Sequence, residues 1–199
     1  ERILKSRLKK AEGAAKEAEA QDLMKLYDQW IANFPSRKGK NMIGSILASK
    51  AQTMMDYKLG TTAEIYAVFD DAFTKDINSF TNPKGLYNYF KTMHDLYKAG
   101  AAGVTPEKLF NKYEEVSEKF ELEGTKLAKK LDVLLKKEES GSPLTTRDLK
   151  NRKKFDTNSK AIGIFLSNLD AIISKESTCE NLIPLYTRNF EENKNDAVW

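Results

Sequence analysis

Apolar residues recur every three or four positions along almost the whole chain, and strand-like alternation of apolar and polar residues is nearly absent. This spacing is typical of amphipathic α-helices, whose apolar stripe packs against a neighbouring element. The chain is therefore expected to be all-α. The pattern predicts helices over residues 1–12, 15–33, 39–57, 63–76, 83–99, 105–138 and 146–174, and a last helix after Thr178.

Short turns join the predicted helices, which suggests antiparallel hairpins stacked side by side. Pro35 cannot continue a helix, and Gly60 and Gly100 stand where two further helices end. The hairpin length, about 34–40 residues, is the period expected of a tetratricopeptide-like α-solenoid. We therefore predict a single helical-repeat domain over 1–199, cut from a longer chain. It would contain degenerate hairpins over 1–104, a long helix pair over 105–174 and the start of a further repeat over 175–199.

Two segments carry part of the tetratricopeptide pattern, in which small and aromatic residues let two helices approach closely. In 44–76 a glycine stands at the turn and an aromatic residue and an alanine follow at the expected offsets, although the preceding tyrosine is one residue too close to the glycine. In 86–120 aromatic residues occupy matching positions on both helices. The residues expected to pack the repeats are Tyr57, Gly60, Phe69, Ala72, Phe90, Tyr97 and Tyr113.

Four stretches resemble a family of tetratricopeptide-repeat proteins from Bacteroidetes: "LMKLYDQWIANFP", "KAQTMMDYKLG", "EIYAVFDDAF" and "STCENLIPLYTRNFEENKNDAVW". The resemblance implies an exported cell-envelope protein, periplasmic or associated with the outer membrane, with a leader and more repeats outside this chain. Cys179, the single cysteine, is expected either to be a small half-buried residue or to pair with a cysteine elsewhere. The resemblance implies that such a partner cysteine lies downstream.

Charge adds little to this picture. The 33 basic and 29 acidic residues leave a net charge of +4, and no stretch approaches the roughly 20 apolar residues of a membrane span. A small net charge of mixed sign does not indicate nucleic acid as a partner. The strongest basic patch comprises Arg147, Lys150, Arg152, Lys153 and Lys154. It is expected to be the solvated start of a helix, and the alternative is contact with an acidic partner or lipid headgroups.

No residue pattern indicates catalysis, a cofactor or a metal. Asp70 and Asp71 are adjacent, so on a helix their side chains point about 100° apart and do not form a catalytic pair. We expect both carboxylates to face water. His94 is the only histidine, which excludes a histidine-rich metal site, and it is expected to pack between helices.

The sequence therefore predicts a non-enzymatic scaffold that binds another protein, because a stack of helical hairpins offers an extended surface for partners. Candidate contact residues are the polar side chains of first helices, namely Asn41, Lys50, Lys91 and Lys98. One alternative is a structural homo-oligomer formed through residues 105–174. Another is a helical enzyme, which would need acidic residues gathered around His94 in one deep pocket.

Overall fold

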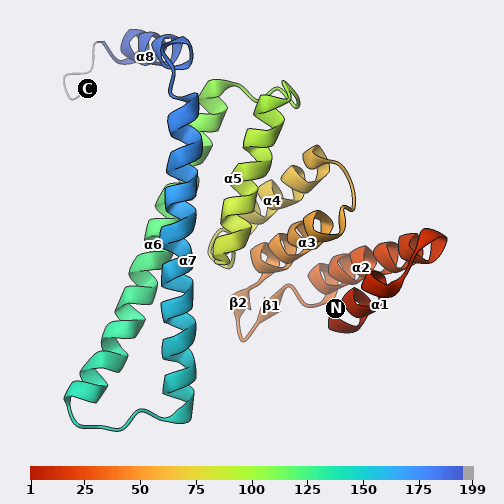
Figure 1. Cartoon of the computed structure of the whole chain (residues 1–199), viewed down its shortest axis with the longest axis vertical. Helices are drawn as coiled ribbons and strands as arrows, with labels where there is room; N and C mark the ends of the chain where they lie inside the picture. The colour runs from red at the N-terminus through yellow and green to blue at the C-terminus, as the bar shows by residue number, and fades with distance from the viewer. Residues whose placement is uncertain (195–199) are drawn as a thin grey trace. The chain divides into compact units, whose positions relative to one another are not determined.

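The computed structural model describes residues 1–194, which form an all-α protein with one short β-hairpin (Figure 1). Its elements are α1 (Arg2–Lys10), α2 (Gly13–Asn33), β1 (Ser36–Arg37), β2 (Lys40–Asn41), α3 (Ile43–Tyr57), α4 (Thr62–Asp76), α5 (Pro83–Lys98), α6 (Pro106–Glu139), α7 (Thr146–Glu176) and α8 (Cys179–Asn193). The all-α prediction is thus confirmed. The end of the predicted repeat over 175–199 lies outside the described residues.

The chain divides into two compact units, Glu1–Thr92 and Met93–Trp199. The division falls inside α5, whereas the sequence pattern placed the change from short hairpins to long helices after residue 104. The first unit contains α1 to α4, the β-hairpin and most of α5. The second contains the last turns of α5 together with α6, α7 and α8.

Four of the helices begin with a threonine that caps the free backbone amides of the first turn. Thr61 accepts a hydrogen bond from the amide of Glu64, whose carboxylate bonds back to the amide of Thr61, so α4 starts with a complete capping box. Thr105, Thr145 and Thr178 cap α6, α7 and α8 in the same way through their hydroxyl oxygens. These caps fix where each helix starts, and that is why most predicted starts are close to the observed ones.

The predicted helix start at residue 39 is wrong. Residues 36–41 instead form an antiparallel hairpin in which Ser36 pairs with Asn41 and Arg37 pairs with Lys40. Lys38 and Gly39 at its tip both have positive φ, 52° and 73°, as a two-residue hairpin turn requires. The strands are only two residues long, so they leave no alternating pattern in the sequence.

The core of the first unit joins α1, α2 and α3. Leu8, Leu23 and Ile46 are almost completely buried there and form one apolar cluster. Tyr27 is buried among them, and its hydroxyl group lies 2.7 Å from the Glu1 carboxylate and 2.8 Å from the Thr53 hydroxyl. This pairing satisfies the polar end of a buried ring, which would otherwise be costly.

Helices α3 and α4 approach each other closely because the second residue of α3 is a glycine. A Cβ atom on Gly44 would lie 2.0 Å from the carbonyl oxygen of Asp76 and 2.9 Å from that of Ala72. The Gly44 amide donates to the Asp76 carboxylate at 3.3 Å, and the Ser79 hydroxyl also bonds to that carboxylate. Asp76 is buried and places its negative charge at the N-terminus of α3, where the helix dipole favours it.

Aromatic rings fill the space between α4 and α5. Phe69, Phe73, Phe80 and Tyr89 are buried, and their ring centroids lie 5.2–6.4 Å apart. This spacing is that of favourable aromatic pairs. The predicted packing role of Phe69 rests on this cluster.

The two adjacent aspartates of α4 have different environments. Asp71 pairs with Lys75 one turn later, at 2.7 Å, on the exposed side of the helix. Asp70 was expected to face water, but it is only partly exposed and accepts a hydrogen bond from the hydroxyl group of the buried Tyr89. That expectation was wrong because Tyr89 reaches Asp70 from α5, 19 residues later in the chain.

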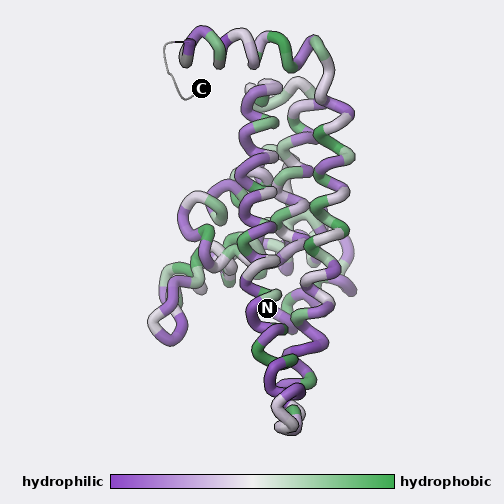
Figure 2. The backbone as a smooth tube through the Cα atoms, turned by 90° about the vertical axis from the view of Figure 1, so that its left-hand side faces the viewer, coloured by the Kyte–Doolittle hydropathy of each residue, from purple (hydrophilic) through white to green (hydrophobic). Residues whose placement is uncertain are grey.

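In the second unit α6 and α7 run side by side as a long antiparallel pair (Figure 1). Hydrophobic and hydrophilic residues are interspersed along both helices, as the green and purple segments in Figure 2 show. The buried residues form one stripe on each helix: Leu109, Val116, Phe120, Leu127 and Leu134 on α6, and Ile162, Leu169 and Ile173 on α7. The structure continues α6 as one helix through Gly124, which faces Ile162 at an ordinary contact distance of 3.9 Å.

The second unit also buries an ion pair on α6. Lys119 is 2% exposed, and its ammonium group lies 2.8 Å from the carboxylate of Glu123. Lys126 reaches the same carboxylate oxygen at 2.8 Å. Burial raises the pKa of Glu123, but the hydrogen bonds from the two lysines outweigh it and leave this pKa below its usual value.

Candidate functional site

A groove with an apolar floor runs along α2, α3 and α4 in the first unit, and its volume is about 980 Å³. We call it the α2–α4 groove. It is lined by Lys16, Glu17, Ala20, Gln21, Met24, Lys25 and Asp28 of α2, by Lys50, Met54 and Tyr57 of α3, by Lys58, Leu59 and Gly60 of the following turn, and by Glu64, Ala67 and Val68 of α4. Its floor consists of apolar side chains, and charged side chains stand at its rim.

The turn between α3 and α4 shapes one end of the groove. Lys58 takes the left-handed conformation that ends α3, with φ of 56°, and Gly60 follows with φ of 91°. A Cβ atom on Gly60 would lie 2.9 Å from the Glu64 carboxylate and 3.3 Å from the terminal methyl group of Met54. Gly60, predicted as a turn residue, therefore permits both the backbone conformation and the close approach of Met54 to the turn.

The groove is long enough for a segment of another chain. Its lining on α2 extends from Lys16 to Asp28, twelve residues along the helix (28 − 16). At about 1.5 Å per residue this corresponds to roughly 18 Å, or a little more than three helical turns. The groove can thus accommodate a helix of about that length along α2.

Two of the acidic groups at the rim are already engaged. Asp28 pairs with Lys50 at 2.5 Å. The carboxylate of Glu64 accepts hydrogen bonds from the backbone amide and the hydroxyl group of Thr61, at 2.7 and 2.9 Å. The hydrogen bond from the amide is the main reason why the pKa of Glu64 is lowered. Lys50 compensates the charge of Asp28, whereas Glu64 keeps its negative charge, because a lowered pKa favours the ionised carboxylate.

The remaining rim charges are mainly positive. Lys16, Lys25 and Lys58 are exposed and have no ion-pair partner within residues 1–194, and the same holds for Glu17. Three ammonium groups without an ion-pair partner face two carboxylates without one, Glu17 and Glu64, so the rim has an excess of one positive charge. The resulting positive potential attracts an acidic partner and fixes its orientation.

The four predicted contact residues are placed in different settings. Lys50 lines the groove and Asn41 lies on β2, where its side-chain oxygen accepts a hydrogen bond from the Ile43 amide at 3.0 Å. Lys91 is half-buried on α5 and makes contacts of its own. Lys98, at the end of α5, forms an ion pair with Glu176. Lys50 is thus the one of the four that lies in the groove.

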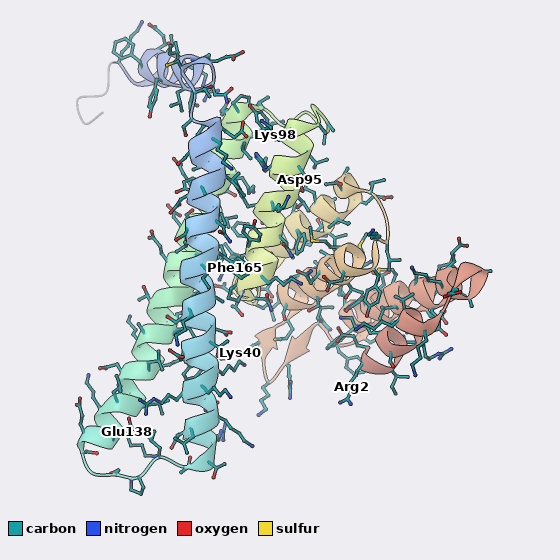
Figure 3. All side chains as sticks on the ribbon, in the orientation of Figure 1. Arg2, Lys40, Asp95, Lys98, Glu138 and Phe165 are labelled. Atoms are coloured by element: carbon teal, nitrogen blue, oxygen red, sulfur yellow. The ribbon has the colours of Figure 1, made fainter. Side chains whose placement is uncertain are left out.

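The predicted basic patch lies at the start of α7. Arg152 pairs with Glu138, at 2.7 and 2.8 Å, across the turn that joins α6 and α7, and Figure 3 shows Glu138 beside this turn. The other members are exposed and have no ion-pair partner in the part of the chain that the structure describes: Arg147, Lys150, Lys153 and Lys154. One of the five charges is therefore compensated within the helix pair.

His94 holds a carboxylate in place. Its Nε2 atom lies 2.9 Å from Glu176 of α7, and Lys98 lies 3.2 Å from the same oxygen. Glu176 is 7% exposed, and the hydrogen bond with His94, followed by that with Lys98, lowers its pKa. His94 thus lies between helices, as expected. Across residues 1–194 no three His, Cys, Asp or Glu side chains gather closely enough to hold a metal ion.

The residues predicted to pack the repeats differ in their burial. Phe69, Ala72 and Phe90 are completely buried. Tyr97 and Tyr113 are partly exposed, and their hydroxyl groups bond to Asn181 and Asp170 at 3.4 and 2.7 Å, respectively. Tyr57, the remaining aromatic residue of the set, lines the groove.

Cys179 is exposed at the first position of α8, so the expectation of a half-buried residue was wrong. The reason is its position directly after the Thr178 cap, where the first turn of α8 faces solvent. A disulfide to a cysteine outside this chain remains a prediction.

Met24 and Ala20 were not identified from the sequence as site residues. The apolar stripe used to predict α2 passes through Leu23 and Tyr27, which are buried against α1 and α3. Ala20 and Met24 widen this stripe on one side. When the apolar face of a helix is wider than one neighbouring helix can cover, part of that face remains for another partner. The width of the apolar face of α2 is therefore the sequence signal that could have located the groove.

The α2–α4 groove is identified as a candidate site by its geometry and its charge. None of the helices within residues 1–194 combines the length and the apolar character that crossing a membrane requires. Compared with known proteins, the chain matches no protein family, no curated protein and no solved structure at a significant level of similarity.

Proposed function

We propose that this protein is a non-enzymatic, tetratricopeptide-like scaffold that binds a helical segment of another protein in the α2–α4 groove. The observation that carries the proposal is the apolar floor, formed by Met24, Met54, Leu59 and Val68, which is open to water over a volume of about 980 Å³. Concave apolar surfaces with a polar rim are typical of interaction sites.

The dimensions and the lining favour a helix as the bound segment. A helix binds in a groove through apolar side chains that recur along one face, and about three turns would follow the roughly 18 Å of α2. Met24 and Met54 lie on the floor, and methionine side chains adapt their shape to different apolar partners. An extended peptide that binds by strand addition would need a free strand edge, which three packed helices do not offer.

The rim favours acidic residues on the flanks of that segment. Lys16, Lys25 and Lys58 have no ion-pair partner among the described residues, and they outnumber the two rim carboxylates that have none, Glu17 and Glu64. A partner helix with one apolar face and glutamates or aspartates beside it would pair with these lysines. We therefore propose an acidic amphipathic helix as the ligand class.

Binding can be tested with two synthetic peptides of about 14 residues, the length of roughly four helical turns. Both carry the same leucine-rich apolar face, and their polar positions are all glutamate in one and all lysine in the other. Fluorescence anisotropy is expected to show binding of the glutamate peptide and much weaker binding of the lysine peptide. If neither peptide binds, the groove is not a site for helices, and the proposal fails.

A matched pair of variants locates the binding. Ala67 lines the groove on α4, whereas Ala18 is exposed on α2 and is not among the lining residues. Ala67→Glu and Ala18→Glu change the net charge equally and suit a helix equally well. A carboxylate placed in the apolar groove is expected to weaken glutamate-peptide binding at least about tenfold, because burial of an unpaired charge costs more than 1.4 kcal/mol. Ala18→Glu is expected to change binding by much less.

The cellular location is part of the same proposal. The resemblance to Bacteroidetes tetratricopeptide-repeat proteins supports a periplasmic or outer-membrane-associated assembly as the setting. A fusion of the full-length protein to a reporter active only outside the cytoplasm would test this, and an inactive reporter would contradict it.

A second candidate function is self-association through α6 and α7. Val133, Leu149 and Ile164 favour it, because these apolar side chains are 64%, 53% and 61% exposed on the long pair. Light scattering over a range of concentrations separates the two candidates. A mass that stays monomeric at all concentrations removes the second one.

A further inference from the structure

The β1–β2 hairpin (residues 36–41) presents a cluster of positive charge beside two exposed aromatic rings. Arg37, Lys38 and Lys40 are all exposed and form no ion pair within the described residues; Figure 3 shows Lys40 on this hairpin. Phe34, at the end of α2, is 69% exposed, and Trp30, one turn earlier, is 38% exposed. Both rings line one cavity together with Arg37, so they form a joint apolar surface beside the charged hairpin rather than single exposed side chains.

No acidic residue compensates this charge nearby in sequence. Between Asp28 and Asp56 the chain contains neither aspartate nor glutamate. Within the hairpin Arg37 lies directly opposite Lys40. Like charges at opposite positions of an antiparallel pair destabilise it. The hairpin therefore places its positive charges together at a cost to its own stability, which an anionic partner would relieve.

The backbone conformation at the tip of the hairpin is also unfavourable for the residue found there. Lys38 has φ of 52°, a left-handed conformation that glycine and asparagine adopt more easily than lysine does. Lys38 is exposed there and adds a third cation to the hairpin.

A shallow cavity of about 490 Å³ lies between the aromatic rings and the hairpin. Its lining includes Trp30, Phe34 and Arg37, together with the hydroxyl-bearing Ser36 of β1 and Ser45 of α3. A guanidinium group and hydroxyl groups beside aromatic rings can hold a phosphate group while the rings contact hydrocarbon. The cavity thus offers polar and apolar contacts side by side.

We propose that the β1–β2 hairpin, with Trp30 and Phe34, docks on an anionic lipid surface. Three uncompensated cations match the negative potential of acidic headgroups, and aromatic rings are favoured at the boundary between headgroups and hydrocarbon. The exposed Phe34 decides between this partner and a purely charged one, because its side chain has no polar atom and gains most by entering an apolar layer. The inference is independent of the α2–α4 groove and of its proposed ligand.

The expected size of the effect follows from the groups involved. Each basic residue near an anionic surface contributes about 1 kcal/mol, or roughly fivefold in the partition coefficient. Neutralising all three is therefore expected to weaken binding about 100-fold. Removing the Phe34 ring is expected to cost about tenfold or more, because burying a phenylalanine side chain is worth about 1.5–3 kcal/mol.

The test measures co-sedimentation of the whole 199-residue chain with vesicles. Vesicles of phosphatidylcholine alone are compared with vesicles that also contain phosphatidylglycerol. Binding is expected only to the second kind, and it is expected to weaken strongly at about 1 M salt, where the Debye length falls to about 3 Å. In a Trp199→Phe background Trp30 is the single tryptophan, so its emission should shift to shorter wavelength on binding.

The decisive comparison uses two sets of charge variants. The combination Arg37→Gln, Lys38→Gln and Lys40→Gln removes three charges from the hairpin. The matched control Lys150→Gln, Lys153→Gln and Lys154→Gln removes three exposed charges from α7. The hairpin set should lose the binding and the control set should keep most of it. Circular dichroism checks that both sets retain their helices.

A second control isolates the aromatic contribution. Phe34→Ala is compared with Ile164→Ala, since Ile164 is similarly exposed, at 61%, on the other unit. Only Phe34→Ala should weaken vesicle binding.

The proposal is overturned if phosphatidylglycerol vesicles do not bind the wild-type chain, or if the hairpin set and the α7 set behave alike. Polyuridylate and polyglutamate are the competing probes. Hairpin-dependent binding of either one, without vesicle binding, would assign the surface to nucleic acid or to acidic protein instead.

Discussion

The close packing of α3 against α4 depends on Gly44, and a single methyl group tests it. In Gly44→Ala the new Cβ atom would start 2.0 Å from the carbonyl oxygen of Asp76. An ordinary contact needs about 3.4 Å, so the helices must separate by about 1.4 Å (3.4 − 2.0) at this end. Backbone atoms stand on both sides of the contact, and no rotamer change can relieve it.

The expected loss of stability combines three contributions. Overpacking typically costs about 1–3 kcal/mol, and separation of the helices weakens the charged hydrogen bond between the Gly44 amide and Asp76, worth about 1.5–3 kcal/mol. Replacing glycine by alanine in a helix returns about 0.5–1 kcal/mol. We therefore expect Gly44→Ala to lower the free energy of unfolding of the first unit by about 2–4 kcal/mol. For a unit of this size the shift in melting temperature is about 10–20 °C.

The measurement is urea unfolding followed by Trp30 fluorescence in a Trp199→Phe background, which reports on the first unit. Gly163→Ala is the matched control. A Cβ atom on Gly163 meets nothing within 4 Å, and the residue is exposed inside α7. The same substitution is therefore expected to raise stability there by about 0.5–1 kcal/mol, as measured by circular dichroism. If Gly44→Ala were neutral or stabilising like Gly163→Ala, the close approach of α3 and α4 would be refuted.

Two further predictions concern the second unit. Glu123→Ala leaves the buried Lys119 without its carboxylate and is expected to lower the free energy of unfolding in urea by about 3–5 kcal/mol. Lys119→Met leaves Glu123 paired with Lys126 and is expected to lower it by much less. Equal losses in the two variants would contradict the pairing. A hydrogen bond from Lys137, and then those from Thr145, lower the pKa of Asp148 from 3.8 to about 2. The stabilisation from Asp148 is thus complete above about pH 3.8 and is lost as the pH falls towards 2. An NMR titration should show that Lys137→Met raises this pKa, and an unchanged value would exclude the Lys137 contact.

The helices were predictable because they depend on local signals. Apolar residues spaced by three and four positions located each helix, and Thr178 marked the start of the last one. Side-chain caps and apolar stripes act within a few residues, so the sequence contains all that is needed to recognise them.

The β1–β2 hairpin was not predictable in the same way. Strands of two residues cannot show alternation, and the turn uses Lys38-Gly39 where asparagine-glycine is the usual signal. The environment of Asp70 was missed for a different reason. Its adjacency to Asp71 correctly argued against a catalytic pair, but its hydrogen bond comes from Tyr89 on another helix, and only the packing of α4 against α5 brings the two together.

The groove exists because of the distances between helices. The spacing of apolar residues along a single helix does not predict these distances. Lys50 was chosen as a polar residue of a first helix, and it does line the groove, but its neighbours Met24 and Ala67 come from helices before and after it. How far α4 stands from α3 is decided at Gly44, which in the sequence looks like any glycine near a helix start. The site is thus a property of packing.

Helix α3 connects the two proposed surfaces, and this makes their tests separable. The C-terminal half of α3 provides Met54 to the α2–α4 groove, and its N-terminal half provides Ser45 to the cavity beside the hairpin. Gly44→Ala moves the N-terminal end of α3, beside Ser45, away from α4 and destabilises the first unit, so it should weaken peptide binding and vesicle binding together. Ala67→Glu should weaken the first alone, and Arg37→Gln, within the hairpin set, the second alone. Loss of both activities in either of these local variants would mean that one surface, rather than two, accounts for them.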